Sequence, residues 1–190
     1  MKIITKKLIL RDLKRSDAKD LQRHANNIHV AKNIPAFPYP YTKKDATKFI
    51  NHCMKESKKK PRANYEFCVN LKSKGKLIGM ISITKVDRFQ RTCTIGYWLG
   101  EEYWRQGIAS EALKKMMEFA FVKLKLRRIN IEAFGDNKSS NGLIKKMGFV
   151  YEGTLRKKLR DKATKKIHDE VKYGMLREEW KASSKKQKTL

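Results

Sequence analysis

A short loop near the middle of the chain has the composition of an anion-binding site. Residues 104–110, with the sequence WRQGIAS, follow an apolar strand-like segment and precede the strongest helical pattern in the chain. Backbone N–H groups at a helix N-terminus point beyond the helix, and small residues such as Gly107 and Ala109 allow a ligand to come close. A pyrophosphate fits such a site. The loop is neither a Walker sequence nor a dinucleotide fingerprint, and taken alone it is better explained as an ordinary tight turn between a strand and a helix.

The segments on either side of this loop must position it. Residues 92–99 alternate as a strand, and residues 129–134 form a second apolar strand. Between them, one face of a long helix is predicted, because its apolar residues recur at helical spacing. These residues are Leu113, Met116, Met117, Ala120, Phe121 and Leu124. A helical crossover between two strands predicts that the strands are parallel.

The rest of the chain adds strands and helices to the same domain. A first strand is expected at residues 8–10, a helix from 16 to 25, and an ordered aromatic loop at 33–41, which contains three prolines. A helix at 43–56 follows the capping pair Thr42 and Asp45, and residues 65–71 and 77–83 form a hairpin. Downstream, we expect a helix at 140–147 that ends at Gly148, and strands at 149–155 and 166–176. One domain thus covers residues 1–180, and residues 181–190 are predicted to be a basic disordered tail.

The net charge of the chain is strongly positive. There are 46 Lys and Arg residues against 19 Asp and Glu residues, which gives a formal charge of +27. Such a field attracts RNA, acidic protein surfaces and phosphorylated cofactors. A general enrichment in lysine is the alternative explanation, because most lysines are scattered along the sequence.

The cysteines and histidines indicate neither a disulfide framework nor a metal site. Cys53, Cys68 and Cys93 are odd in number and widely spaced, as expected of free thiols in a reducing compartment. His168 and Asp169 are adjacent in a predicted strand and therefore point to opposite faces. We expect no metal. No apolar stretch is long enough to span a membrane and the start lacks a secretory signal, so a cytoplasmic location is expected.

Taken together, the motifs resemble those of the GNAT superfamily of acetyl-CoA-dependent N-acetyltransferases, in particular its RimJ/RimL-type branch of ribosomal-protein N-terminal acetyltransferases. The matching segments are LILR at 8–11, DA at 17–18, PYT at 40–42, IGMI at 78–81, IGYWL at 95–99, GIASEAL at 107–113, NKSS at 137–140, MGF at 147–149 and EG at 152–153, followed by Asp169, Tyr173, Leu176, Glu179 and Trp180. Trp104 stands where the superfamily has Gln or Arg, as is common in this branch. Arg105 replaces a residue that is often small and adds a cation beside the phosphates.

The resemblance implies a fold and a set of acetyl-CoA contacts. The fold would be α/β (α+β): a mixed, mostly antiparallel sheet flanked by helices, whose fourth and fifth strands splay apart around the pantetheine arm. The backbone of Trp98 and Leu99 would bond that arm, and Asn137 and Ser140 would lie near the thioester. The pyrophosphate would be held by the loop residues Arg105, Gln106, Gly107, Ile108, Ala109 and Ser110.

The resemblance also suggests catalytic residues. Attack on a thioester needs a neutral amine, so a carboxylate base is expected. Glu132 occupies a position where some relatives have a catalytic Glu, although it could equally be paired with a neighbouring Lys or Arg. Ser140 matches a serine that some relatives use to protonate the thiolate, although Ser is also a common helix N-cap. Glu101 and Glu102 are fallback bases, although solvated surface carboxylates are the favoured interpretation of both.

The expected activity is transfer of an acetyl group from acetyl-CoA to a primary amine, by direct attack in a ternary complex. The acceptor would most simply be the N-terminal α-amine of a ribosomal or other protein, approached from the side of the aromatic loop at residues 37–41. A small-molecule amine, such as an antibiotic or amino sugar, is the alternative acceptor. A ribosome- or RNA-binding module with little catalysis is the alternative of another class. The sequence is compatible with a monomer or a homodimer.

Overall fold

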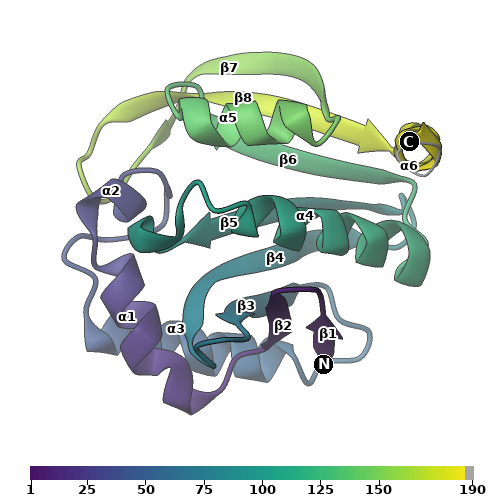
Figure 1. Ribbon diagram of the computed structural model, residues 1–190. Coiled ribbons are helices and arrows are strands. Elements are labelled where there is room, and N and C mark those ends of the chain that lie inside the picture. Colours follow the sequence, from purple (N-terminus) through teal and green to yellow (C-terminus); the bar gives the residue numbers. More distant parts are fainter. Residues whose placement is uncertain (187–190) are drawn as a thin grey trace.

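Eight strands form one mixed sheet within residues 1–186, the part of the chain that the computed structural model describes (Figure 1). Their order is β1-β2-β3-β4-β5-β6-β8-β7. The strands are β1 (Lys2–Ile4), β2 (Leu8–Asp12), β3 (Tyr65–Leu71), β4 (Leu77–Asp87), β5 (Thr92–Leu99), β6 (Arg128–Phe134), β7 (Val150–Arg160) and β8 (Ile167–Leu176). Neighbouring strands in this sheet are antiparallel except for β5 and β6, which are parallel as predicted.

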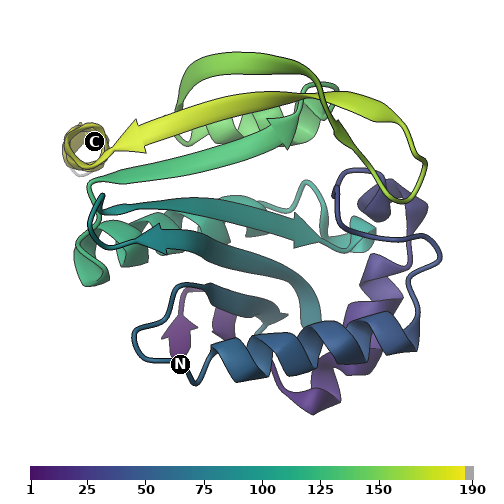
Figure 2. The same ribbon diagram turned by 180° about the vertical axis from the view of Figure 1, so that it is seen from behind.

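Helices cover both faces of the sheet (Figures 1 and 2). The α-helices are α1 (Ala18–Ala25), α2 (Ile28–Ala31), α3 (Lys43–Glu56), α4 (Ile108–Glu118), α5 (Lys138–Lys146) and α6 (Arg177–Lys186). Short 3-10 turns η1 (Arg15–Asp17) and η2 (Glu101–Tyr103) and a π-helical turn η3 (Phe119–Lys123) join them. α4 and α5 lie on one face, whereas α1 and α3 lie on the other.

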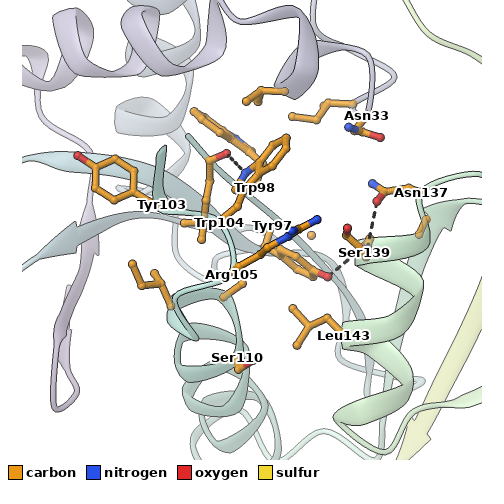
Figure 3. Close-up of a pocket in the computed structure, with 18 of the residues that line it drawn as sticks. Asn33, Tyr97, Trp98, Tyr103, Trp104, Arg105, Ser110, Asn137, Ser139 and Leu143 are labelled. Atoms are coloured by element: carbon orange, nitrogen blue, oxygen red, sulfur yellow. Dashed lines mark hydrogen bonds between the residues drawn. The ribbon is translucent and has the colours of Figure 1, made fainter. Parts of the chain in front are cut away.

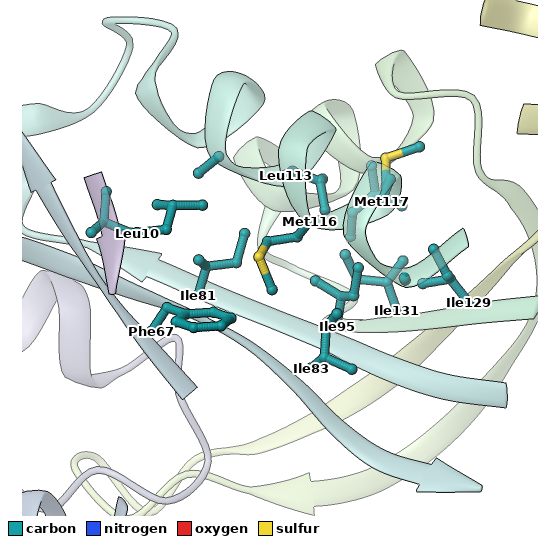
Figure 4. Close-up of a cluster of buried hydrophobic side chains, with 14 of the residues drawn as sticks. Leu10, Phe67, Ile81, Ile83, Ile95, Leu113, Met116, Met117, Ile129 and Ile131 are labelled. Atoms are coloured by element: carbon teal, nitrogen blue, oxygen red, sulfur yellow. The ribbon is translucent and has the colours of Figure 1, made fainter. Parts of the chain in front are cut away.

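The two faces of the sheet have separate hydrophobic cores because successive strand residues point to opposite sides. Phe67 and Ile81 are fully buried against α4, where Leu113 and Met116 meet them (Figure 4). On the other face, residues such as Cys68 and Met80 pack against Leu21 of α1 and Ile50 of α3. The buried face of α4 is the one that its helical spacing predicts.

Local capping signals account for the ends of two helices. The Thr42 hydroxyl accepts a hydrogen bond from Asp45 N at the start of α3, and the Asp45 carboxylate accepts one from Thr42 N, which completes the predicted capping box. α5 begins at Lys138, two residues earlier than predicted, because Asn137 caps it. It stops before Gly148, which adopts a φ of 87°, as predicted.

Several elements differ from the sequence-based expectation. β1 and α2 are too short to leave a periodic pattern, and neither is predicted. β4 and β7 extend beyond their predicted ends because their last residues are mostly polar, which weakens the alternation of apolar residues that predicts a strand. The long helix predicted up to Leu124 is α-helical only to Glu118, and an i+5 hydrogen bond from Leu124 N to Phe119 O closes the π-turn that follows.

The C-terminal segment forms a helix that the sequence does not predict. α6 continues to Lys186, so residues 181–186 are not the disordered tail that the sequence suggests, and residues 187–190 lie outside the described part. The Trp180 ring lies 5.3 Å from the Phe121 ring, and the Glu179 carboxylate accepts a hydrogen bond from Leu176 N. Glu178 and Glu179 in the first turn favour the helix through its dipole.

β5 and β6 separate at their C-terminal ends, and this separation creates the site described below. They pair from Thr92 with Arg128 to Ile95 with Ile131, and the pairing then stops although both strands continue. Figure 2 shows the two strand ends diverging. The family resemblance implies that the fourth and fifth strands splay apart. β1 is an additional edge strand, so β5 and β6 correspond to that pair, and the predicted splay is present.

Candidate active site

A cavity of about 530 Å³ occupies the gap between the ends of β5 and β6 (Figure 3). Both strands line it, together with the start of α4, the start of α5 and the loop that follows α2. The predicted site residues come from four separate segments, and all of them line this one cavity. They are Trp98, Leu99, Arg105, Gln106, Gly107, Ile108, Ala109, Ser110, Glu132, Asn137 and Ser140.

The N-terminus of α4 presents unpaired backbone donors to the cavity. Gly107 is the N-cap residue, and no side chain caps the helix there. The first intrahelical hydrogen bond in this turn runs from Glu111 N to Gly107 O, so the amides of residues 108–110 have no partner within the helix. Gly107 has a φ of 75°, which L-residues rarely adopt, and a Cβ there would meet no atom within 4 Å. The result is an open, positively polarised cradle.

Side chains of the loop before α4 fix its shape. The Trp104 indole N–H donates to Leu99 O over 2.9 Å, and the Gln106 side chain donates to Glu102 O over 2.7 Å. Arg105 adopts a φ of 58°, and its side chain extends across the cavity toward α5 (Figure 3). One lone pair of the Leu99 carbonyl is therefore already used, which leaves the other for a ligand.

On the α5 side, two hydroxyl groups meet in the cavity wall. Ser140 Oγ lies 3.0 Å from the Tyr97 hydroxyl, and Ser140 N donates to the Asn137 side chain over 3.1 Å. The interpretation of Ser140 as a helix N-cap is therefore wrong, because Asn137 fills that position. Burial raises the pKa of Tyr97 although the bond to Ser140 opposes this shift, so its hydroxyl stays protonated at neutral pH. Sequence reasoning missed Tyr97, and only its place in the strand next to Trp98 could have suggested it.

Glu132 lies on the opposite face of the sheet from this hydroxyl pair. Ile131 packs into the α4 core, so alternation turns Glu132 to the other side, where its side chain is 28% exposed. Lys172, its cross-strand partner on β8, donates to Glu132 Oε1 over 3.0 Å and lies 3.4 Å from Glu170 Oε2. The bond to Glu132 raises the pKa of Lys172. Both interpretations of Glu132 are thus compatible, since it is ion-paired and also lines the cavity.

The alternative bases lie elsewhere. Glu101 accepts a hydrogen bond from Asn27, and Glu102 pairs with Arg23 at 2.9 Å. Together with His24 these four residues line a separate surface pocket of about 330 Å³. Neither glutamate lines the cavity between β5 and β6.

The cysteines do not line the cavity, and all three are buried. Burial raises the pKa of Cys68 and of Cys93 to about 12, so both are thiols at neutral pH. His168 contacts Asp136 and Asp161, whereas Asp169 turns away and accepts a hydrogen bond from Lys157 N. Within residues 1–186, no group of three His, Cys, Asp or Glu side chains is arranged to hold a metal ion. No helix in that range is long and apolar enough to cross a membrane.

The cavity suits an extended ligand with a phosphorylated end. Free amides at the positive end of α4 match phosphate oxygens, and the unpaired backbone beyond Ile95 and Ile131 matches the amide groups of a pantetheine chain. The Tyr97 and Ser140 hydroxyls lie in the wall of the same cavity, on the side of α5. Acetyl-CoA therefore fits the residues present.

Comparisons with known proteins agree with this geometry. The family model described as acetyltransferase (GNAT) domain matches residues 7–150. The N-acetyltransferase YnaD of Bacillus subtilis, itself uncharacterized, is 31% identical over 180 residues, which are 95% of this chain and 99% of that protein. The ribosomal-protein-serine acetyltransferase of Escherichia coli is 39% identical over 80 residues, which are 42% of this chain and 45% of that protein. This chain thus matches less than half of that relative's length.

A solved structure extends the comparison to nearly the whole fold. The RimL ribosomal L7/L12 alpha-N-protein acetyltransferase, solved in complex with coenzyme A, matches with a TM-score of 0.81 at 20% identity, covering 92% of this chain and 96% of that chain. The family match spans well over half of the chain. The protein therefore belongs to the GNAT acetyltransferase family and is an acetyl-CoA-dependent N-acetyltransferase.

Proposed function

We propose that this enzyme acetylates the N-terminal α-amine of a protein, with a ribosomal protein as the first candidate. The observation that carries the proposal is the arrangement of three side chains around the gap between β5 and β6. Glu132 faces one side of the sheet, and the bonded pair Tyr97 and Ser140 lies on the other. A base and an acid on opposite sides of one cavity suit attack by an amine on a thioester.

Each group has a distinct role in this proposal. Acetyl-CoA supplies an activated acetyl thioester, with its phosphates at the amides of residues 106–110 beside Arg105, and its arm along Trp98 and Leu99. Asn137 fixes the first turn of α5 and thereby the position of Ser140. Ser140, oriented by Tyr97, gives a proton to the departing thiolate. Glu132 takes the proton from the amine, directly or through a water molecule.

An α-amine is a better acceptor for this site than a lysine side chain. An α-amino group has a pKa of about 8 and a lysine of about 10.4, so far more of the α-amine is neutral at pH 7. Lys172 keeps its proton beside Glu132, because its pKa is raised by that bond. An α-ammonium group therefore gives up its proton to a carboxylate base more readily than a lysine side chain does.

Direct transfer fits the site better than a covalent enzyme intermediate. A thiolate would be the nucleophile for such an intermediate. All three cysteines are buried outside the cavity, and Cys93, the one on β5, has a pKa raised to about 12 by burial. The acceptor amine is therefore proposed to attack while acetyl-CoA is bound.

The acceptor side is proposed to be the face of the sheet that carries Glu132 and Trp98. Phe37 packs edge-on against Trp98, with the ring centroids 5.4 Å apart, and also against Tyr41. The aromatic loop thus closes this face next to the cavity, as the sequence suggests. The relative in Escherichia coli that acts on a ribosomal-protein serine supports a protein acceptor.

The test is to supply the purified enzyme with acetyl-CoA and each class of acceptor. These are salt-extracted ribosomal proteins, the same proteins with chemically blocked N-termini, and a panel of polyamines and amino sugars. Thiol release gives the rate, and intact-mass and peptide mass spectrometry locate the acetyl group. Glu132→Gln serves as the control for enzyme-dependent transfer.

The proposal expects release with the unblocked proteins and an acetyl group on an N-terminal residue. Equal transfer to the blocked proteins would instead assign the activity to lysine side chains. Release with the small amines alone would show that the acceptor is a small molecule.

A further inference from the structure

We infer that the tip of the β7–β8 hairpin is a docking site for an acidic stretch of the acceptor polypeptide, downstream of the amine that is acetylated. This inference rests on the proposed function, because it concerns the acceptor of that reaction. The tip is defined here as residues 156–166. It is the end of the hairpin that lies beside the loop after α2 (Figures 1 and 2).

The tip carries a dense positive charge on its surface. Seven of its eleven residues are basic, and all seven are exposed: Arg156, Lys157, Lys158, Arg160, Lys162, Lys165 and Lys166. Lys166 pairs with Asp136 at 2.7 Å. None of the other six has an ion-pair partner within residues 1–186.

The two aspartates of the hairpin, Asp161 and Asp169, are engaged in hydrogen bonds within it. Asp161 is fully buried and accepts hydrogen bonds from the backbone and hydroxyl of Thr164. Asp169 accepts the backbone N–H of Lys157 over 2.7 Å. This bond holds a bulge in β7, where residues 156–158 stand between the pairs Leu155 with Glu170 and Leu159 with His168. Three consecutive basic residues are therefore displayed without a compensating carboxylate at the surface.

The tip is also held in place rather than left as a free loop. His168 is buried, stacks on Phe134 at 4.0 Å, and has one ring nitrogen 2.9 Å from Asp136 and the other 3.1 Å from Asp161. A basic surface that is already ordered loses little conformational entropy when it binds an anionic segment. The anchoring thus favours a docking role over a solvated charge run.

The location of the tip ties it to the acceptor. Lys162 N donates to Pro35 O over 3.2 Å, and the two residues before Pro35, Asn33 and Ile34, line the cavity. In the inferred complex, a polypeptide whose amino terminus reaches Glu132 leaves the cavity past this wall. Its next residues then pass through the positive field of the tip, which stabilises carboxylates and repels ammonium groups.

An acidic polypeptide fits these observations better than RNA. Residues 156–166 contain no aromatic side chain on which a base could stack. The charge is also concentrated next to the opening for the amine, where a protein acceptor must pass. Competition by RNA is therefore an outcome of the test and not the proposal.

The experiment compares three peptides with identical first residues and a following stretch that is acidic, neutral or basic. Initial rates are measured with wild type, with the variant Lys158→Gln/Arg160→Gln/Lys162→Gln, and with Lys55→Gln/Lys58→Gln/Lys60→Gln. The last variant removes the same charge near the end of α3, at the opposite end of the molecule (Figure 2). Each rate is measured at low salt and at physiological salt.

We expect kcat/KM for the acidic peptide to exceed that for the neutral peptide by about tenfold at low salt. The two peptides should differ in KM and not in kcat, and this difference should shrink as salt is added. The tip variant should lose this preference while its rate with the neutral peptide is unchanged. The α3 variant should keep the preference.

Several outcomes would overturn the inference. Equal rates with the three peptides would remove the docking role and leave the proposed function intact, whereas no N-terminal transfer to any peptide would contradict the proposed function itself. An equal loss in the two variants would assign the preference to net charge. If an RNA oligonucleotide loses affinity for the tip variant while the acidic preference survives, the tip is an RNA site.

Discussion

The two sides of the cavity between β5 and β6 offer different chemical groups to a ligand. On the α4 side, the groups offered to a ligand are backbone amides and glycine, and they belong to one continuous segment, residues 105–110. On the proposed acceptor side, the group offered is the side chain of Glu132, which cross-strand pairing of β6 with β8 places beside Lys172.

This difference determines how each side can be damaged. A backbone site depends on φ angles and on space, so it fails when a residue with a Cβ is forced into the wrong conformation. A side-chain site depends on chemical identity, so it fails on an isosteric change that removes a charge or a proton. The variants below change one side at a time, from the largest expected effect to the smallest.

Replacing Glu132 with Gln should have the largest effect on turnover. The change keeps the shape of the side chain and removes the base, so kcat should fall by about 10²- to 10³-fold, within the range of general base catalysis. Steady-state kinetics measure this loss. Glu170→Gln is the matched control, because Glu170 also contacts Lys172 but does not line the cavity, and its kcat should stay within about threefold of wild type. Equal losses in the two variants would contradict a catalytic role for Glu132.

Replacing Gly107 with Val should damage the other side. A φ of 75° costs an L-residue about 1–2 kcal/mol, so the KM for acetyl-CoA should rise about tenfold. Gly142→Ala is the matched control, since Gly142 lies within α5, needs no positive φ, and has room for a Cβ with no atom within 4 Å. A Gly107→Val enzyme with unchanged KM would show that the start of α4 is not the phosphate site.

The hydroxyl pair should have an intermediate effect. Ser140→Ala removes the proposed proton donor and should lower kcat by about tenfold, whereas Tyr97→Phe removes only the group that orients it and should lower kcat by about threefold. Both are read from kcat at saturating substrates. A larger loss in Tyr97→Phe than in Ser140→Ala would mean that Tyr97 itself gives the proton.

The smallest effect on catalysis is expected from the anchor of the hairpin tip, where the readout is stability. Burial raises the pKa of Asp161, but hydrogen bonds from Thr164 and His168 outweigh it and hold that pKa below the ordinary 3.8. The carboxylate therefore contributes stability above about pH 3.8, and the contribution is lost as pH falls through the lowered pKa. Asp161→Asn should unfold more easily than wild type at pH 7 by about 1–3 kcal/mol.

Denaturant unfolding at a series of pH values checks this expectation. The difference between wild type and Asp161→Asn should narrow as the pH falls below 3.8, because both proteins then carry a neutral side chain there. A difference that stays constant with pH would assign the effect to packing and not to the charge of Asp161.

The contrast between the two sides also explains what the sequence could predict. The α4 side is local in sequence, so the glycine, the small residues and the helical period around residues 104–113 suffice to locate it. The parallel pair β5 and β6 follows from the crossover between them. The splay of these strands and the positions of Asn137 and Ser140 are predicted only by the family resemblance. That resemblance itself rests on local sequence motifs.

What the sequence could not provide depends on contacts between distant segments. The pairing of Lys172 with Glu132, the bond from Tyr97 to Ser140 and the position of His168 between two aspartates each join residues at least seven positions apart, in most cases more than thirty. No periodicity records such contacts. α6 was missed for another reason, since its several lysines give the segment the composition of a tail while Trp180 anchors it.

The central claim is that the two sides act separately, one holding acetyl-CoA and the other handling the amine. Calorimetric titration of acetyl-CoA into wild type, Glu132→Gln and Gly107→Val tests this claim directly. Glu132→Gln should bind acetyl-CoA within about twofold of wild type although its turnover is lost, and Gly107→Val should bind about tenfold more weakly. Weakened binding in Glu132→Gln together with unchanged binding in Gly107→Val would contradict the account.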